Sequence, residues 1–330
     1  MKSCLRSILR LTAVSGVACG GYLIGKYENP DSTFRSRAEG LLSRLSLPSV
    51  FAATPLTNKG PHKQVTLYTE KDLEDPEFSD TIEKHREKMG EIMKYGYPSM
   101  DNVQYYENFV LSYDRRTRVA NWVFEHLTKG KSVKKNDKVD RSKCEFYEDV
   151  TIHPYFRATN ADYKRSGFDR GHLAAAGNHK SNQKTCEQTF VLSNMAPQVG
   201  EGFNRSSWNR LEKYVRSLVR KYKDVYVCTG PLYLPRVEKD GKTYVKYQVI
   251  GTNTVAVPTH FFKVILVQQH DDSLEMEAYV MPNQPIPDNV SLEKFQVPIQ
   301  SIERAAGLIF FHKVERNELK KFNGKLLTGK

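Results

Sequence analysis

"SGFDRGHLAAAGN" (residues 166–178) places an aspartate, an arginine, a glycine and a histidine side by side between a Ser-Gly turn and a polar loop. Residues 167–173 of this stretch have the pattern of a short strand, and "TFVLSNMAPQ" (189–198) has the pattern of a second one. The next stretch, "VGEGFNRSSWNRLE" (199–212), leads into a helix. The order strand, long loop, strand and helix predicts a ββα unit that carries the histidine in its first strand.

The helix of this unit has one apolar stripe and basic residues on its other faces. The stripe consists of residues at i, i+3, i+7, i+10, i+11 and i+14, namely Trp208, Leu211, Val215, Leu218, Val219 and Tyr222. The basic residues are Arg205, Arg210, Lys213, Arg216, Arg220 and Lys221. Such a helix packs its stripe on a core and leaves its charges near the surface.

The chain from about residue 101 onward has the texture of an α+β fold, with a central antiparallel β-sheet flanked by helices. Short apolar runs separated by turn residues predict strands at "DVYVCTGPLYL" (224–234), "YVKYQVI" (244–250), "FFKVILV" (261–267) and "MEAYVM" (276–281). A helix is predicted to start near Pro298 and to end at Gly307. Another is predicted within residues 71–94, with Ser79 and Asp80 as its cap.

The composition favours a polyanionic partner. The chain of 330 residues has 50 Lys and Arg against 38 Asp and Glu, a formal net charge of +12. Four of these positive charges lie in the first 27 residues, and +8 remains without them. Nucleic acid or an acidic membrane surface fits this excess, and a solvated basic face is the alternative.

The N-terminal segment resembles a mitochondrial targeting helix. Lys2, Arg6 and Arg10 share one helical face, and the first acidic residue is Glu28. A membrane anchor at residues 11–25 is the second interpretation, although fifteen residues are few for a span. A secretory signal peptide ranks third, because no small-residue cleavage site follows the apolar run.

The cysteines give no sign of a disulfide framework or a zinc site. Beyond the leader, Cys144, Cys186 and Cys228 are odd in number and widely spaced, and no C-x-x-C occurs among them. Buried or surface thiols are the expected state.

An ordered set of segments extends the pattern beyond the ββα unit. The set comprises "KYGYP" (94–98), "LSYDRRTRVANWVFEHL" (111–127), "SGFDRGH" (166–172), "FVLSNMAPQVGEGFNRSSWNRLE" (190–212), "TGPLYLP" (229–235) and "VAVPTHFFKVI" (255–265). Over roughly residues 94–311 the chain resembles the DNA/RNA non-specific nuclease family of ββα-metal enzymes, and in particular its mitochondrial endonuclease branch. An exonuclease-type branch has Ser where this motif has Asp169, which favours the endonuclease branch.

The resemblance implies a Mg²⁺-dependent, sugar-non-specific endonuclease that hydrolyses DNA and RNA and leaves 5′-phosphate ends, with Mn²⁺ as a substitute cation. It also implies a homodimer in the mitochondrial intermembrane space or at the inner membrane, with relocation to the nucleus during cell death. The domain organisation then follows as a targeting segment and linker at 1–55, an N-terminal extension with a short helix at 56–100, and a ββα-metal nuclease domain at 101–330.

Phosphodiester hydrolysis needs a nucleophilic water, stabilisation of the charged phosphate oxygens and help for the departing 3′ oxygen. A neutral histidine suits the activation of water, since its ordinary pKa is near 6.5. We assign this role to His172, with a hydrogen-bonded core histidine as the alternative. The resemblance makes Asn204 the single direct metal ligand, and a helix N-cap is the alternative for this residue.

Glu212 follows Asn204 by eight residues, about 80° around a helix at 100° per residue, so both side chains can point to a common side. The resemblance makes Glu212 a carboxylate that holds metal-bound water. The alternative is a surface ion pair with Arg216 at i+4.

Other site residues follow from the motif. Arg141 and Arg170 are expected to bind phosphate oxygens, and Asp169 is expected to orient its neighbours. Asn194 is expected to hydrogen-bond within the site and to steady its strand, with a turn asparagine as the alternative. The absence of a side chain at Gly171 allows close backbone approach.

Three basic stretches flank this site, at residues 115–118, at 129–143 and on the outer face of the helix at 205–221. Phosphate contacts carry little sequence information, so broad specificity and strong salt dependence are expected. Two alternative functions remain at this point: an exonuclease-type member of the same superfamily, and a non-catalytic basic protein that binds nucleic acid or anionic lipid.

Overall fold

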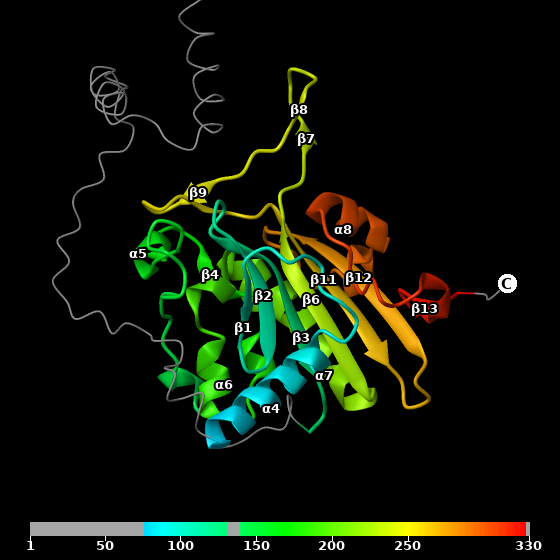
Figure 1. Ribbon diagram of the computed structural model, residues 1–330. Helices are drawn as coiled ribbons and strands as arrows, with labels where there is room; N and C mark the ends of the chain where they lie inside the picture. Colours follow the sequence, from blue (N-terminus) through cyan, green and yellow to red (C-terminus); the bar gives the residue numbers. More distant parts are fainter. Residues whose placement is uncertain (1–75, 131–138, 328–330) are drawn as a thin grey trace, which may run out of the picture. The chain divides into compact units, whose positions relative to one another are not determined.

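The computed structural model describes residues 76–130 and 139–327 (Figure 1). The predicted targeting segment, anchor and linker at 1–55 lie outside the described residues, and so does most of the basic stretch at 129–143. No helix in the part of the chain that the structure describes is long and apolar enough to cross a bilayer.

A large mixed sheet forms the centre of the fold. Its strands in spatial order are β1 (Val103–Tyr105), β2 (Phe109–Asp114), β3 (Val119–Leu127), β6 (Asp224–Leu232), β11 (His260–Gln268), β12 (Leu274–Pro282), β13 (Leu319–Phe322) and β14 (Lys325–Leu326). Neighbouring strands are antiparallel except for β12 and β13, which are parallel. The predicted α+β class with a central, largely antiparallel sheet is confirmed.

Alternating residues of the central strands build two separate cores, one on each face of the sheet. Val227 and Phe261 contribute to the core beneath α7 (Asn209–Lys221). Tyr226 and Phe262 point the other way, into a core shared with α4 (Pro76–Ile92) and α8 (Ile299–Ala306). Since successive side chains of a strand alternate between faces, a continuous apolar run places good core residues on both sides. Helices therefore cover both faces (Figure 1).

The predicted helices have nearly the expected bounds. α8 follows Pro298 and ends at Gly307, whose φ of 68° is the left-handed conformation that glycine adopts without strain. α4 begins at Pro76, so the expected cap at Ser79 and Asp80 is wrong, because both residues lie inside the helix. Proline at a first helical position loses no intrahelical bond.

The predicted strand at residues 244–250 is wrong. This segment contributes only β8 (Thr243–Tyr244) and β9 (Val249–Ile250), which pair with β7 (Arg236–Val237) and β10 (Val255–Ala256) in two small ladders. Val245, Tyr247 and Val249 are exposed, so its alternation does not reflect a buried face. β7 and β8 extend away from the main sheet (Figure 1).

The ββα unit lies beside the sheet in the order predicted. β4 (Asp169–His172) pairs antiparallel with β5 (Met195–Gln198), which places His172 opposite Met195. A helical segment, η4 (Gly200–Trp208), then continues into α7, with a turn at Gly202 where φ is 73°. Short helices occupy the connections: η1 (Arg141–Lys143), α5 (Asn160–Tyr163), η2 (Ala176–Asn178), α6 (Gln183–Gln188), η3 (Leu192–Asn194), η5 (Leu292–Phe295) and η6 (Arg316–Glu318).

Candidate active site

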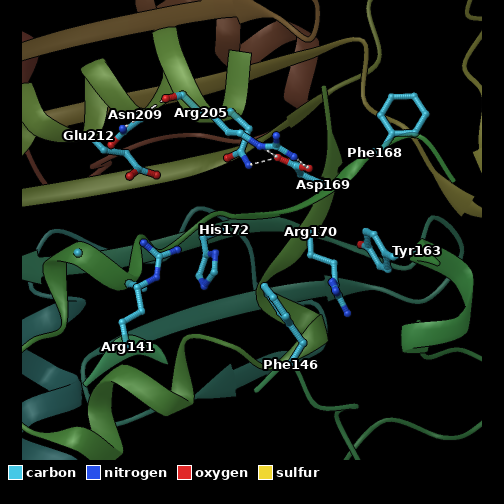
Figure 2. Close-up of a pocket in the computed structure, with 13 residues that line it drawn as sticks. Arg141, Phe146, Tyr163, Phe168, Asp169, Arg170, His172, Arg205, Asn209 and Glu212 are labelled. Carbon is cyan, nitrogen blue, oxygen red and sulfur yellow. Dashed lines mark hydrogen bonds and ion pairs between the residues drawn. The ribbon is translucent and has the colours of Figure 1, made fainter. Parts of the chain in front are cut away.

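A polar cavity of about 500 Å³ opens between β4 and the η4–α7 helix. Five of the six predicted site residues line it, namely Arg141, Arg170, His172, Asn204 and Glu212. Figure 2 shows Glu212 on the helical side of the cavity, with His172 and Arg141 facing it from the opposite side. The ββα unit and the preceding η1 segment thus bring together residues that are up to 71 positions apart in the chain, from Arg141 to Glu212.

The imidazole of His172 is held between two aromatic rings. Its ring centroid lies 4.7 Å from that of Phe190 and 5.7 Å from that of Phe146. Nε2 is buried without a hydrogen-bond partner, so the alternative of a hydrogen-bonded core histidine does not hold. Burial, together with the positive charge of Arg141, lowers the pKa of His172 to about 3. The ring is therefore neutral at pH 7 and able to accept a proton.

Asp169 sets the orientation of the Asn204 amide. Asn204 Nδ2 donates to Asp169 Oδ2 at 2.9 Å, and Arg205 donates to both carboxylate oxygens, from Nε at 2.9 Å and from Nη2 at 2.7 Å. Burial by itself raises the pKa of Asp169, but these hydrogen bonds outweigh it and lower the pKa. An ionised carboxylate accepts only, so it must face the Asn204 amide nitrogen, which leaves Oδ1 of Asn204 for another partner.

The N-cap alternative for Asn204 is wrong. The backbone is non-helical at Glu201 and Gly202 and helical after them, so Asn204 has helical backbone angles, which an N-cap residue does not, and its backbone N–H donates to the carbonyl oxygen of Val199 at 2.9 Å. Its side chain bonds Asp169 instead of a free N–H of the first turn.

Glu212 is largely enclosed. Its Oε2 lies 3.9 Å from Arg216 Nη1, and the two side chains are only 16% and 17% exposed, so the alternative of a surface ion pair does not hold. Burial raises the pKa of Glu212, and the nearby positive charges of Lys263 and Arg216 oppose that rise. Glu212 therefore holds a proton more readily than an exposed glutamate does.

The two arginines are positioned by aromatic contacts. The guanidinium carbon of Arg141 lies 5.8 Å from the ring centroid of Phe190, and that of Arg170 lies 4.3 Å from the ring centroid of Phe146. Arg170 Nη1 also donates to Asn160 Oδ1 at 2.6 Å. Contacts of this kind hold a guanidinium without neutralising its charge, so it remains able to pair with an anion.

Asn194 lies behind the cavity and does not line it. The side chain is fully buried, with Oδ1 accepting from Ala174 N at 2.9 Å and Nδ2 donating to the carbonyl oxygens of Ala174 and Thr189. These bonds fix the backbone at Ala174, two residues after His172. A direct contact with substrate does not fit this position.

Gly171 has the predicted close neighbour. A Cβ at this position would lie 2.1 Å from the side chain of Gln198 on the paired strand β5. Only glycine leaves room there, so the strand before His172 can pack flat against its partner.

A buried charged network underlies the cavity, and no sequence pattern predicts it. Glu125 Oε1 accepts from Asn178 Nδ2 at 3.0 Å and lies 2.8 Å from His179 Nε2. Asn178 Oδ1 accepts from Arg216 Nη1 at 3.2 Å. Lys263, only 2% exposed, donates to Thr229 Oγ1 and lies over the ring of Trp208 at 4.9 Å. Lys263 lies in the strand predicted from the apolar run at 261–267, and Glu125 lies in β3, for which no strand is predicted.

Sequence reasoning also missed Arg205, Phe146 and Phe190 as parts of the site. Arg205 was assigned to the solvent-facing side of the helix, because its pairing with Asp169 joins residues 36 apart. Phe146 and Phe190 have no motif of their own. The three cysteines among the described residues are buried and free, as expected, although the sulfur atoms of Cys144 and Cys186 lie 3.7 Å apart.

The donor set fits a hard divalent cation that keeps much of its water shell. The Asn204 amide oxygen and the Glu212 carboxylate line the same cavity, and both are oxygen donors. Within residues 76–130 and 139–327, no group of three or more His, Cys, Asp or Glu side chains is arranged to hold a metal. Asn204 would hold the cation directly and Glu212 would hold its water.

Three comparisons with known proteins agree with this geometry. Residues 88–317 match the family model for DNA/RNA non-specific endonuclease. The chain is 45% identical over 312 residues to mitochondrial endonuclease G of Caenorhabditis elegans, covering 94% of each chain. It is 57% identical over 221 residues to mitochondrial endonuclease G of Homo sapiens, covering 67% of this chain and 73% of the human one.

The structural comparison points the same way. A chain of the EndoG/EndoGI complex crystal structure is 61% identical, with a TM-score of 0.72, and the match covers 73% of this chain and 98% of that chain. With more than half of its length matched by the family model and with relatives well above 30% identity, the chain belongs to the DNA/RNA non-specific endonuclease family.

Proposed function

We propose that this protein is a mitochondrial, Mg²⁺-dependent endonuclease that hydrolyses phosphodiester bonds in DNA and RNA without selecting the sugar. Family membership supports the nuclease activity, the nucleic-acid substrate and the dependence on a metal. The observation that carries the site assignment is the convergence on one cavity of a neutral His172 and an Asn204 whose amide oxygen is left available by Asp169.

His172 acts as the general base in this proposal. Because Nε2 is enclosed, we assign proton acceptance from the attacking water to Nδ1. A pKa of about 3 would make the free ring a weak base. The bound phosphodiester carries a negative charge, which favours the imidazolium and raises this pKa at the moment when the proton must be taken.

Arg141 and Arg170 pair with the non-bridging phosphate oxygens, since both are permanently charged and line the cavity. Asp169 and Arg205 keep the Asn204 amide in one orientation, and Asn194 holds the backbone after His172. Glu212 accepts hydrogen bonds from water at the metal position. A bound Mg²⁺ would supply electrostatic stabilisation of the departing 3′ oxygen, which leaves the phosphate on the 5′ side. One amide and water ligands suit Mg²⁺, which dehydrates reluctantly, and Mn²⁺ is the expected substitute.

The cellular address and assembly are also proposed. The acid-free leader and the names of the mitochondrial relatives support mitochondrial import. Within that address we propose the intermembrane space or the inner membrane, with nuclear relocation during cell death. We keep the domain limits at 1–55, 56–100 and 101–330. A homodimer is supported by exposed apolar residues on the segment that contains β7–β9, such as Val237 and Val245, 69% and 52% exposed. Subcellular fractionation and sedimentation equilibrium test these points.

The decisive experiment is cleavage of a closed circular plasmid by residues 60–330, with Mg²⁺ and with EDTA. Linear and nicked products that require Mg²⁺ are expected, because an endonuclease needs no free end. His172→Ala should lower the rate by at least about a hundredfold, the usual scale for a general base. An unchanged rate would remove the proposed base. Cleavage of linear DNA alone would favour the exonuclease-type alternative, and binding without turnover would favour a non-catalytic protein.

A further inference from the structure

A cluster of exposed aromatic side chains lies on the loop that precedes α5. Tyr155 is 71% exposed and Phe156 is 38% exposed, although large aromatic rings are usually buried. The ring of His153 lies 4.7 Å from that of Tyr155 and 5.6 Å from that of Phe156. Three neighbouring rings therefore present their surfaces at one place outside the cavity.

The loop that carries these rings is held rigidly. Tyr113, from β2, donates its hydroxyl proton to the carbonyl oxygen of Phe156 at 3.0 Å, and Arg118 Nη2 donates to the carbonyl oxygen of Tyr155 at 3.1 Å. Ile152 and Ala158 are buried on either side of the rings. Because the backbone is fixed on both sides of the rings, this loop loses little conformational entropy when a ligand binds to them.

Positive charge accompanies the rings. The guanidinium of Arg115 lies 5.8 Å from the ring centroid of Phe156, and Arg116 is exposed beside it in the same turn. Of the nearby carboxylates, Glu148 pairs with Arg157, whereas Asp114 accepts hydrogen bonds from the neutral groups Arg116 N and Thr117 Oγ1 and keeps its charge. Arg115, Arg116 and Arg118 outnumber that one charge. The charge of this surface therefore complements a polyanion better than an acidic or neutral protein face.

The aromatic cluster adjoins the cavity through α5. Asn160 accepts the hydrogen bond from Arg170, and Tyr163 lines the cavity at the same end as Phe168 and Arg170 (Figure 2). Asn160 follows Phe156 by four positions, so their Cα atoms lie within roughly 14 Å of each other.

We propose that Tyr155 and Phe156, with Arg115 beside them, form a stacking platform for unpaired bases of the nucleic acid whose backbone enters the cavity. Aromatic faces and guanidinium groups bind every base in this way, without reading its identity. The inference rests on the proposed function and adds to it the form of substrate. Single-stranded and locally opened segments bind more tightly than intact duplex.

The test measures binding to fluorescently labelled single-stranded oligonucleotides by anisotropy in EDTA, with His172→Ala as the parent so that no strand is cut. The variant is Tyr155→Ala/Phe156→Ala. The control is Tyr105→Ala, which removes a ring 46% exposed on β1. A second oligonucleotide of the same length carries abasic sites in place of its bases. Tyr155→Trp keeps a stacking face, and Tyr155→Ala alone serves if the double variant does not fold.

We expect the double variant to bind the normal oligonucleotide at least about fivefold more weakly, the lower end of the stacking range. Binding of the abasic strand and the salt dependence should not change, because the phosphate contacts remain. Tyr155→Trp and Tyr105→Ala should bind like the parent. Equal weakening on both strands, or none on either, would overturn the platform. If the double variant changes its oligomeric mass but still prefers the normal over the abasic strand as the parent does, the aromatic rings form an interface between protein chains instead. If the parent binds no oligonucleotide at all, the proposed function itself fails.

Discussion

Replacing Lys263 with methionine tests whether the buried charges beneath the cavity balance one another. Lys263 lies in the middle of β11, and its ammonium donates to Thr229 on the neighbouring strand β6. Burial lowers the pKa of Lys263, while the negative charges of Glu125 and Glu212 raise it. With Arg216, the network holds two cations and two carboxylates. Methionine keeps most of the alkyl volume but removes one cation, so two buried carboxylates face a single arginine.

Lys263 forms no direct ion pair and balances the two carboxylates through their mutual field. Loss of one charge from such a buried set costs about 3–5 kcal/mol, taking the value for a buried pair, because the remaining charges stay desolvated. For a domain of 150–250 residues, each kcal/mol lowers Tm by about 2–4 °C, so a fall of about 6–20 °C is expected. Urea denaturation and calorimetry measure both quantities. The m-value should stay constant, because the surface exposed on unfolding does not change.

Two further variants separate charge balance from general damage. Lys313→Met removes an exposed lysine and should change the free energy of unfolding by less than about 0.5 kcal/mol. Adding Glu125→Gln to Lys263→Met removes the uncompensated negative charge and keeps Oε1 as an acceptor for Asn178. The double variant should recover at least about 1 kcal/mol of coupling energy. The charge balance would be refuted if Lys263→Met lowered the free energy of unfolding by less than about 1 kcal/mol. It would also be refuted if the effects of Lys263→Met and Glu125→Gln were strictly additive.

The site makes three other predictions. The unfolded chain takes up a proton at His172 with the ordinary pKa of 6.5, whereas the folded ring takes it up only near pH 3. The stabilisation that comes from keeping His172 neutral is therefore complete above pH 6.5. As the pH falls from 6.5 toward 3, the free energy of unfolding decreases by up to about 1.4 kcal/mol per pH unit. His172→Leu should flatten urea-measured stability over that window by this amount, and an unchanged slope would contradict the buried neutral ring. Gly171→Ala drives a methyl group into Gln198 and should lower the free energy of unfolding, measured by chemical denaturation, by about 1–3 kcal/mol. Most of the activity should be lost as well. A fully active and equally stable variant would disprove the close packing. Asp169→Ala releases the Asn204 amide and should weaken metal binding about 10–100-fold in calorimetric Mg²⁺ titration; an unaltered affinity would show that Asp169 does not orient it.

The helices and strands that sequence patterns predicted correctly are those whose apolar pattern matches their burial, periodic in the helices and nearly continuous in the central strands. α7 has a continuous stripe from Leu211 to Val219 buried on the sheet, and α8 is bounded by Pro298 and Gly307, two residues with strong local preferences. The apolar runs in β6, β11 and β12 are buried over most of their length. The run at 244–250 has similar residues but no partner face, which no local pattern reveals.

Local patterns in the amino-acid sequence suffice to predict the order of the ββα unit and the polar residue types that line the cavity. His172, Asn204 and Glu212 were identified by type, spacing and family resemblance, because motif positions are local. Three features emerge only when the chain packs: Asp169 turns the amide of Asn204, Glu212 is enclosed, and the buried Lys263 feels the charge of Glu125. Each of these depends on which groups lose their water when distant segments pack together. Desolvation and pairing are properties of that packing, so spacing along the chain carries no record of them.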